Sequence, residues 1–263
     1  MHPFQLHKAT SAAQASTLLA GKADGKFLAG GQSLIAAMKL RLNSPSDLID
    51  LGSAADLKGI KSDGKTVTIG AMTTHAEVAA SADVQKAIPA LASLARLIGD
   101  RQVRNVGTIG GSIANNDPAA DYPAAVLGLN ATINTNKRAI PADQFFRGLY
   151  DTTLEAGELI TSVSFPIPQK AAYMKFRNPA SRFAMVGVMV AQTAGGVRVA
   201  VTGGGAGVFR VADMEKALAS NWSADAIAGI KVPESGLSSD LHASAEYRAH
   251  LIGVMARRAV AAA

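Results

Sequence analysis

The sequence predicts an α+β protein in which a second unit begins near residue 168. Three observations predict this class. Segments with strand character alternate with segments of helical periodicity, capping residues mark several helix starts, and Pro166-Ile167-Pro168 makes a stiff break. After the break, two long strand-like runs follow each other directly. The 263 residues, 48% of them hydrophobic, are enough to bury a sizeable core.

The first part of the chain alternates short helices with short strands. Ser11 to Gln14 have capping-box spacing, which predicts a helix over residues 16–20 that ends at Gly21. Residues 26–29 read as a buried strand, and a glycine turn with a helical pattern follows them. Residues 47–51 read as the next strand.

The remaining elements follow from the same signals. Thr74 to Glu77 form a second capping box before a helix, and Pro89 suits the first turn of another helix that Gly99 ends. The other expected strands are 66–69, 131–135, 158–165, 184–194 and 197–202, and the other expected helices are 212–219, 223–228 and 244–262.

Composition excludes several classes of function. The chain has no cysteine, so it has no disulfide, thiol nucleophile or iron–sulfur cluster on its own thiolates. The net charge is +6, but the basic residues are scattered along the chain, which argues against nucleic-acid binding. The five histidines lack the spacing of metal ligands. No stretch reaches the ~20 apolar residues of a membrane span, and residues 1–14 lack a signal-peptide core. We therefore expect a cytoplasmic protein without a metal site.

Two glycine pairs suggest an anion site. Gly30-Gly31 and Gly110-Gly111 are each followed closely by a serine. Paired glycines let backbone N–H groups approach phosphate oxygens, and a following helix adds partial positive charge. The alternative is that each pair only makes a tight turn. The Gly203–Gly207 run lacks the G-x-G-x-x-G spacing and is more typical of a loop.

Four segments carry a family resemblance: AGGQSLIAAMKLRL, IGDRQVRNVGTIGGSIANNDPAADYPA, PASRFAMVGV and SAEYRAHLIGVMARRAV. They resemble the FAD-binding medium subunit of the molybdenum hydroxylases, the group of carbon monoxide dehydrogenase and bacterial xanthine dehydrogenases. The resemblance implies a two-subdomain FAD-binding fold of the PCMH or vanillyl-alcohol-oxidase type over residues 1–167, split near 55–60. A small C-terminal α+β domain would follow over residues 168–263.

The resemblance also implies a set of cofactor-binding residues and no catalytic or metal-binding ones. The diphosphate and its neighbouring groups would be held by Ala29, Gly30, Gly31, Gln32, Ser33 and Leu34 together with Thr108, Ile109, Gly110, Gly111 and Ser112. Ile98 and Leu159 match positions that line the flavin and adenine, although apolar residues are equally expected there in any core.

Five further positions are assigned to the cofactor by the resemblance. Asp121 would accept hydrogen bonds from the ribose or adenine end, or would be an ordinary acid at a helix start. Asn115 and Asp117 would contact the cofactor or only shape their turn. Lys175 would lie near the flavin pyrimidine edge. Phe183 stands where the family often has tyrosine, so a hydroxyl at the ring edge is missing.

The implied activity is electron transfer through FAD. A large molybdopterin-binding subunit would oxidise the substrate and a small 2Fe-2S subunit would relay electrons, in a dimer of heterotrimers without nucleic acid or a membrane span. Two alternatives are a self-contained FAD oxidoreductase and a non-catalytic scaffold subunit that has lost the flavin. The substrate (carbon monoxide, an aldehyde or an N-heterocycle) and the acceptor stay open.

Overall fold

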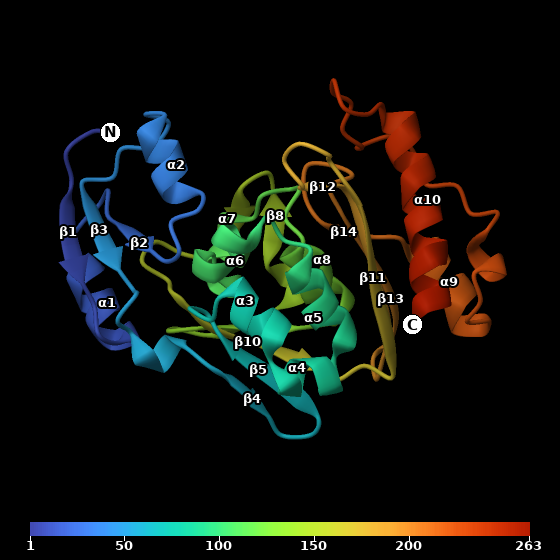
Figure 1. Cartoon of the computed structure of the whole chain (residues 1–263), viewed down its shortest axis with the longest axis horizontal. Helices are drawn as coiled ribbons and strands as arrows, with labels where there is room; N and C mark the ends of the chain where they lie inside the picture. The colour runs from blue at the N-terminus through green and yellow to red at the C-terminus, as the bar shows by residue number, and fades with distance from the viewer.

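A computed structural model describes all 263 residues, which form three lobes along the longest axis (Figure 1). The first lobe is a parallel sheet with strand order β1-β3-β2. Leu48 and Ile49 are adjacent on its central strand and both are fully buried, so helices cover both faces of this sheet. The lobe contains β1 (Gln5–Lys8), α1 (Ala12–Leu19), β2 (Lys26–Leu28), α2 (Leu34–Lys39), β3 (Asp47–Asp50) and the 3-10 helix η1 (Ala55–Leu57).

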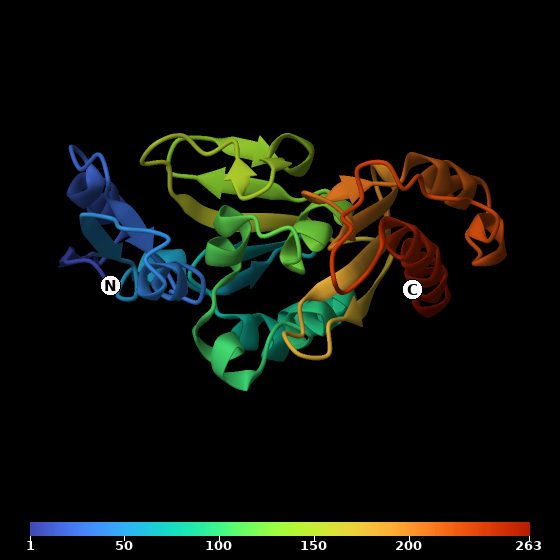
Figure 2. The same ribbon diagram turned by 90° about the horizontal axis from the view of Figure 1, so that it is seen from above.

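The middle lobe is an antiparallel sheet with strand order β4-β5-β10-β6-β7, packed against a layer of helices. Figure 2 shows the helices on one side of this sheet and a small hairpin on the same lobe. Its strands are β4 (Ile60–Ser62), β5 (Thr66–Gly70), β6 (Thr132–Thr135), β7 (Ala139–Pro141) and β10 (Ile160–Pro166), with the hairpin β8 (Phe146–Gly148) and β9 (Asp151–Thr152). Its helices are α3 (His75–Ala80), α4 (Ala82–Ala87), α5 (Pro89–Arg96), α6 (Arg101–Val106), α7 (Ile109–Asn115), α8 (Tyr122–Gly128) and η2 (Ala142–Gln144).

The third lobe is an antiparallel sheet with order β11-β12-β13-β14, and helices cover both of its faces. Along β12, Val188 packs in the cluster beneath α9 and α10, whereas the next residue, Met189, belongs to the core of the middle lobe. The two lobes therefore share one continuous core. The elements are β11 (Lys170–Arg177), β12 (Ala184–Thr193), β13 (Gly196–Thr202), β14 (Phe209–Arg210), α9 (Ala212–Ser220), η3 (Asp225–Ile227) and α10 (Ala245–Ala262). The boundary between the two expected domains, placed between residues 167 and 168, stays a prediction.

Most expected elements are confirmed, and the differences have local causes. The first helix begins at Ala12, directly after Ser11, because the Ser11 side chain accepts from the Gln14 N–H. The basic segment after Gly99 is a helix, α6, capped by the Asp100 side chain. The expected helix over 223–228 is only the single turn η3. None of the helices combines the length and the apolar character needed for a passage through a membrane.

Candidate cofactor site

The two glycine-rich segments touch each other where the first lobe meets the middle lobe. Gly30 lies against the end of α6: a Cβ at this position would be 2.1 Å from the carbonyl oxygen of Val106 and 2.9 Å from Gly107 Cα. A Cβ on Gly111 would be 3.4 Å from Ala29 Cβ. Segments far apart in the sequence therefore form one junction, and at Gly30 only glycine fits it.

The first segment presents unused backbone donors. Gly31 has a φ of +67°, which suits glycine, and α2 starts three residues later at Leu34. None of the N–H groups of Gly30 to Leu34 donates to an acceptor of the chain, and the Ser33 hydroxyl has no partner either. Consecutive free N–H groups at a helix start form a binding site for an anion.

The second glycine pair lies in a helix, whereas the sequence predicts a second turn there. Gly110 and Gly111 lie in the first turn of α7, and Thr108 caps that helix by accepting from the Gly111 N–H at 3.1 Å. The N–H groups of Ile109 and Gly110 donate to backbone carbonyls within residues 71–73, at 3.1 and 2.9 Å. The amides of Ile109, Gly110, Gly111 and Ser112, expected to bind phosphate, are thus already used. This glycine pair serves close packing instead.

The donors that remain fit a diphosphate-bearing cofactor. Besides the free N–H groups of residues 30–34, the hydroxyls of Ser33 and Ser112 have no hydrogen-bond partner in the chain. The segment 29–34 contains no acidic residue that would repel an anion. The glycine junction and this donor set together match the chemistry of the FAD diphosphate.

Asp121 and Lys175, two predicted cofactor residues, bind each other in the protein interior. Lys175 Nζ donates to Asp121 Oδ2 at 2.9 Å and to the Leu97 carbonyl at 3.1 Å, and the Tyr173 hydroxyl donates to Asp121 Oδ1. The side chains of Lys175 and Asp121 are 2% and 4% exposed. Burial raises the pKa of the Asp121 carboxyl, and the Lys175 ammonium opposes that rise. Both carboxylate oxygens therefore already have donors from β11.

The other predicted residues are spread around this junction. Asp117 accepts from the Ala119 N–H at 2.8 Å and from the Tyr150 hydroxyl at 3.2 Å, in the turn that follows Asn115 at the end of α7. Ile98 is half-buried, and its carbonyl accepts from an arginine of α6.

Leu159 and Phe183 differ in their exposure. Leu159 is 5% exposed in the small hydrophobic cluster against which Ala29 packs. Phe183 is 47% exposed on the loop between β11 and β12, and its carbonyl accepts from the Asn178 N–H. The structure brings Leu159 to the same cluster as the first glycine segment, whereas Phe183 lies on the third lobe.

His75, which the sequence indicates as a surface or capping residue because it follows Thr74, is instead buried. A Cβ on Gly107 would be 2.6 Å from His75 Nε2, so the imidazole lies directly beneath the junction. The ring is 5% exposed, and neither of its nitrogens has a hydrogen-bond partner in the chain. Burial, with a smaller effect from the Arg104 charge, lowers the pKa of His75 to about 4.

This low pKa predicts acid sensitivity between pH 6.5 and 4. The folded chain holds His75 neutral while the unfolded chain protonates it near pH 6.5, so the unfolding free energy falls as pH drops from 6.5 to 4. The His75 share of that loss is about 3 kcal/mol. Denaturant titrations at pH 7 and pH 4 measure the fall in unfolding free energy between these pH values. This fall should be about 3 kcal/mol smaller in His75→Leu than in the wild type. Equal losses in both proteins would contradict the assignment.

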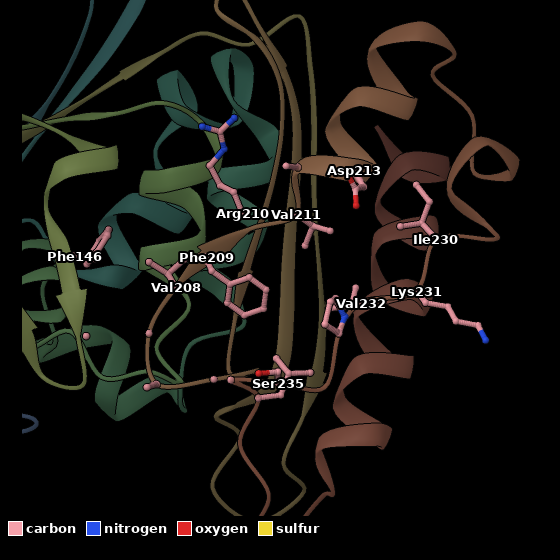
Figure 3. A pocket seen from close by; sticks show the side chains of 18 of the residues that line it. Phe146, Val208, Phe209, Arg210, Val211, Asp213, Ile230, Lys231, Val232 and Ser235 are labelled. Carbon is pink, nitrogen blue, oxygen red and sulfur yellow. The ribbon is translucent and has the colours of Figure 1, made fainter.

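A separate cavity of about 530 Å³ lies away from the glycine junction. It is lined by β8, by the segment 205–213 that contains β14, and by the loop 230–237. Figure 3 shows Phe209 and Val232 within this region, whereas the charged ends of Arg210 and Lys231 point away from it. A cavity whose lining mixes apolar residues with Asp213, and from which the Arg210 and Lys231 ends point away, does not suit a diphosphate.

Comparison with known proteins identifies the family over the part of the chain that contains both glycine pairs. Residues 2–168 match the family described as the FAD binding domain in molybdopterin dehydrogenase. The chain is 36% identical to the carbon monoxide dehydrogenase medium chain of Hydrogenophaga pseudoflava, covering 99% of this chain and 96% of that one. It is 37% identical to the nicotine 6-hydroxylase medium subunit of Paenarthrobacter nicotinovorans, covering 94% and 92%.

A solved structure shows the same fold over nearly the whole chain. It is a reconstituted CO dehydrogenase from Oligotropha carboxidovorans, with a TM-score of 0.89 and 33% identity, and the match covers 99% of this chain and 97% of that one. The chain therefore belongs to the FAD-binding medium subunits of the molybdenum hydroxylases, the oxidoreductase family that includes carbon monoxide dehydrogenase and xanthine dehydrogenase.

Proposed function

We propose that this chain is the flavin subunit through which a molybdenum hydroxylase passes its electrons to an external acceptor. The observation that carries the proposal is the junction of the two glycine segments, where free N–H groups of residues 30–34 face no acceptor of the chain. When bound there, FAD supplies the redox chemistry. The chain itself offers no cysteine and no cluster of potential metal ligands, so its task is to bind and orient the cofactor.

The proposed binding set has two parts. The N–H groups of Gly30 to Leu34 and the hydroxyl of Ser33 would hold the diphosphate, with the Ser112 hydroxyl contributing from α7. Ala29 and Thr108 would complete the junction, and Ile109 with the glycine pair of α7 would shape it without donating their amides, which already bind acceptors of the chain. Ile98, Asn115, Asp117, Leu159 and Phe183 would line the cofactor beyond the diphosphate.

The proposed partners are a large molybdopterin-binding subunit and a small 2Fe-2S subunit, assembled as a dimer of heterotrimers in the cytoplasm. The support is that the relatives matched over almost their full length are medium chains of multisubunit enzymes. One such relative is a carbon monoxide dehydrogenase chain and another a nicotine hydroxylase chain, so the substrate stays open among carbon monoxide, aldehydes and N-heterocycles.

The test is the visible spectrum of the purified full-length chain, before and after incubation with FAD. We expect flavin absorbance at one FAD per chain that bleaches on anaerobic reduction. A colourless chain that cannot be loaded with FAD contradicts the proposal and favours a scaffold subunit. Full turnover by this chain alone contradicts the multisubunit assignment instead.

Ser112→Ala should weaken FAD binding about tenfold, because a hydroxyl without another partner in the chain would lose its bond to a charged phosphate. Titration of the apo chain with FAD, followed by flavin fluorescence, measures the change. Ser93→Ala, on the exposed side of α5, is the matched control and should leave Kd unchanged. An equal Kd for both variants would remove Ser112 from the binding set.

A further inference from the structure

The turn between α7 and α8 is held in place by the third lobe. We define the α7–α8 turn as residues 116–121. Three consecutive backbone carbonyls of this turn each accept a hydrogen bond from a third-lobe residue. The bonds run from the Gly203 N–H to Pro118 at 2.8 Å, from the Ala184 N–H to Ala119 at 3.3 Å and from the Thr202 hydroxyl to Ala120 at 2.7 Å. The path of the turn therefore depends on residues that come much later in the sequence.

Thr202, the last residue of β13, supplies the only side-chain donor among these bonds. Its hydroxyl also lies 3.0 Å from the Pro118 carbonyl oxygen, and the Ala120 carbonyl has no other donor in the chain. Its methyl group packs beside Gly187, where a Cβ would be 2.9 Å from Thr202 Cγ2. Because Thr202 is fully buried, its side chain cannot touch a ligand in a cleft. Any effect of this hydroxyl on a ligand must pass through the turn.

The β8–β9 hairpin holds the start of the same turn. Asn116 is fully buried and has a φ of +44°, a conformation that asparagine adopts more readily than most residues. Its side-chain amide donates to the carbonyls of Gly148 at 2.8 Å and of Asp151 at 2.7 Å. The hairpin thus fixes the turn at residue 116 and the third lobe fixes it at residues 118–120. If the third-lobe bonds are lost, the part of the turn after residue 116 is free to move.

The turn is connected to the proposed cofactor site in two ways. Helix α7 begins at the glycine junction, carries the Ser112 hydroxyl and ends directly before the turn, and its seven residues span about 10 Å. Pro118 and Ala119 also line a cavity of about 200 Å³ together with Phe183. Figure 1 shows α7 and α8 between the first lobe and the sheet of the third lobe. The position of the turn therefore affects both the placement of Ser112 and the shape of this cavity.

We propose that Thr202 is a positioning residue for FAD binding, which acts through the α7–α8 turn on Ser112 and on the cavity wall beside Phe183. The proposal rests on the proposed function, which assigns Ser112, Asp117 and Phe183 to the cofactor. It makes the third lobe part of the cofactor-binding unit, although the family match ends at residue 168. The methyl group of Thr202 serves packing, whereas its hydroxyl serves the site.

The experiment measures the Kd for FAD and the Tm of three variants of the full-length apo chain. Thr202→Val keeps the shape of the side chain and removes the hydroxyl, whereas Thr202→Ser keeps the hydroxyl and removes the methyl group. Thr193→Val is the matched control, since Thr193 is a buried threonine of the same sheet whose hydroxyl donates to Gly196 in its own hairpin.

The three variants should separate the hydroxyl from the packing. Both valine variants should lower Tm by a few degrees, because each removes the hydrogen bond of a buried hydroxyl. We expect the Kd for FAD to rise about fivefold or more in Thr202→Val, because the Ala120 carbonyl loses its donor. The Kd should stay within twofold of the wild type in Thr202→Ser and in Thr193→Val.

Amide hydrogen exchange of the wild-type chain tests the same link without a substitution, so it decides even if Thr202→Val does not fold. Coupling between two sites is reciprocal, so bound FAD should stabilise the bonds by which the third lobe holds the turn. The Gly203 N–H, which donates to Pro118, should exchange about fivefold or more slowly with FAD bound. The Val211 N–H, which donates to Val199 in β13, is the control and should slow less than twofold. Equal slowing at both amides would show general stabilisation and would overturn the proposal.

Three results with the variants overturn the proposal without affecting the cofactor assignment. A Kd within twofold of the wild type in folded Thr202→Val would show that the hydroxyl does not act on the site. An equal loss of affinity in Thr202→Ser would assign the effect to the packing of the methyl group, and an equal loss in Thr193→Val would assign it to a loosened third lobe. If the wild-type chain itself binds no FAD, it is the proposed function that fails.

Discussion

Gly30→Ala should abolish FAD binding at micromolar concentrations of cofactor. A Cβ at this position would lie 2.1 Å from the carbonyl oxygen of Val106 and 2.8 Å from its carbonyl carbon, so backbone atoms rather than a flexible side chain stand in its way. The junction between the first lobe and α6 must then open. Because the free N–H groups of residues 30–34 start at this point, their placement relative to Ser112 is lost with it. We expect Kd to rise at least a hundredfold, about 3 kcal/mol.

Gly253→Ala is the matched control for this substitution. Gly253 lies inside α10, and a Cβ there meets no atom within 4 Å, so alanine should raise stability slightly and leave FAD binding unchanged. Isothermal titration of the two apo variants with FAD gives the comparison, and their melting temperatures show whether Gly30→Ala stays folded. A folded Gly30→Ala protein that binds FAD within threefold of wild type would refute the glycine junction as the cofactor site.

The local features of this junction could be predicted from the sequence because they depend on neighbouring residues. The strand, the Gly30-Gly31 turn and the helix that starts at Leu34 follow from periodicity and glycine, and the structure confirms them. The capping box at Thr74 is also confirmed, with both reciprocal hydrogen bonds present.

What the sequence could not predict depends on contacts across the fold. The Gly110-Gly111 pair looks the same in sequence as the first pair, but Thr108 caps a helix there and nearby carbonyls accept its amides. Whether an N–H is free depends on which carbonyl the fold brings to it. Likewise, Asp121 and Lys175 are 54 positions apart, and only the fold brings β11 to the residue that precedes α8 and so makes them a pair.

That pair also bears on the role of Asp121, for which the sequence predicts either a cofactor contact or a place at a helix start. If its task is to receive the ribose or adenine of FAD, Asp121→Asn should weaken FAD binding and leave the apo chain as stable as the wild type. The structure supports a third role, because the side chain does not cap α8 and the Lys175 ammonium, 2% exposed, has this carboxylate as its only ion-pair partner. Removing one member of a buried ion pair leaves the other charge uncompensated, at a cost of roughly 3–5 kcal/mol.

We therefore expect Asp121→Asn to lower the unfolding free energy of the apo chain by about 3 kcal/mol, which corresponds to a fall in Tm of about 6–12 °C. Adding Lys175→Met to this variant removes the orphaned charge, so the double variant should be more stable than Asp121→Asn alone. Glu155→Gln, at the exposed pair with Lys137, is the control and should cost less than about 1 kcal/mol. Should the apo Tm of Asp121→Asn match the wild type while its FAD affinity drops, the carboxylate belongs to the cofactor and the pair with Lys175 is incidental.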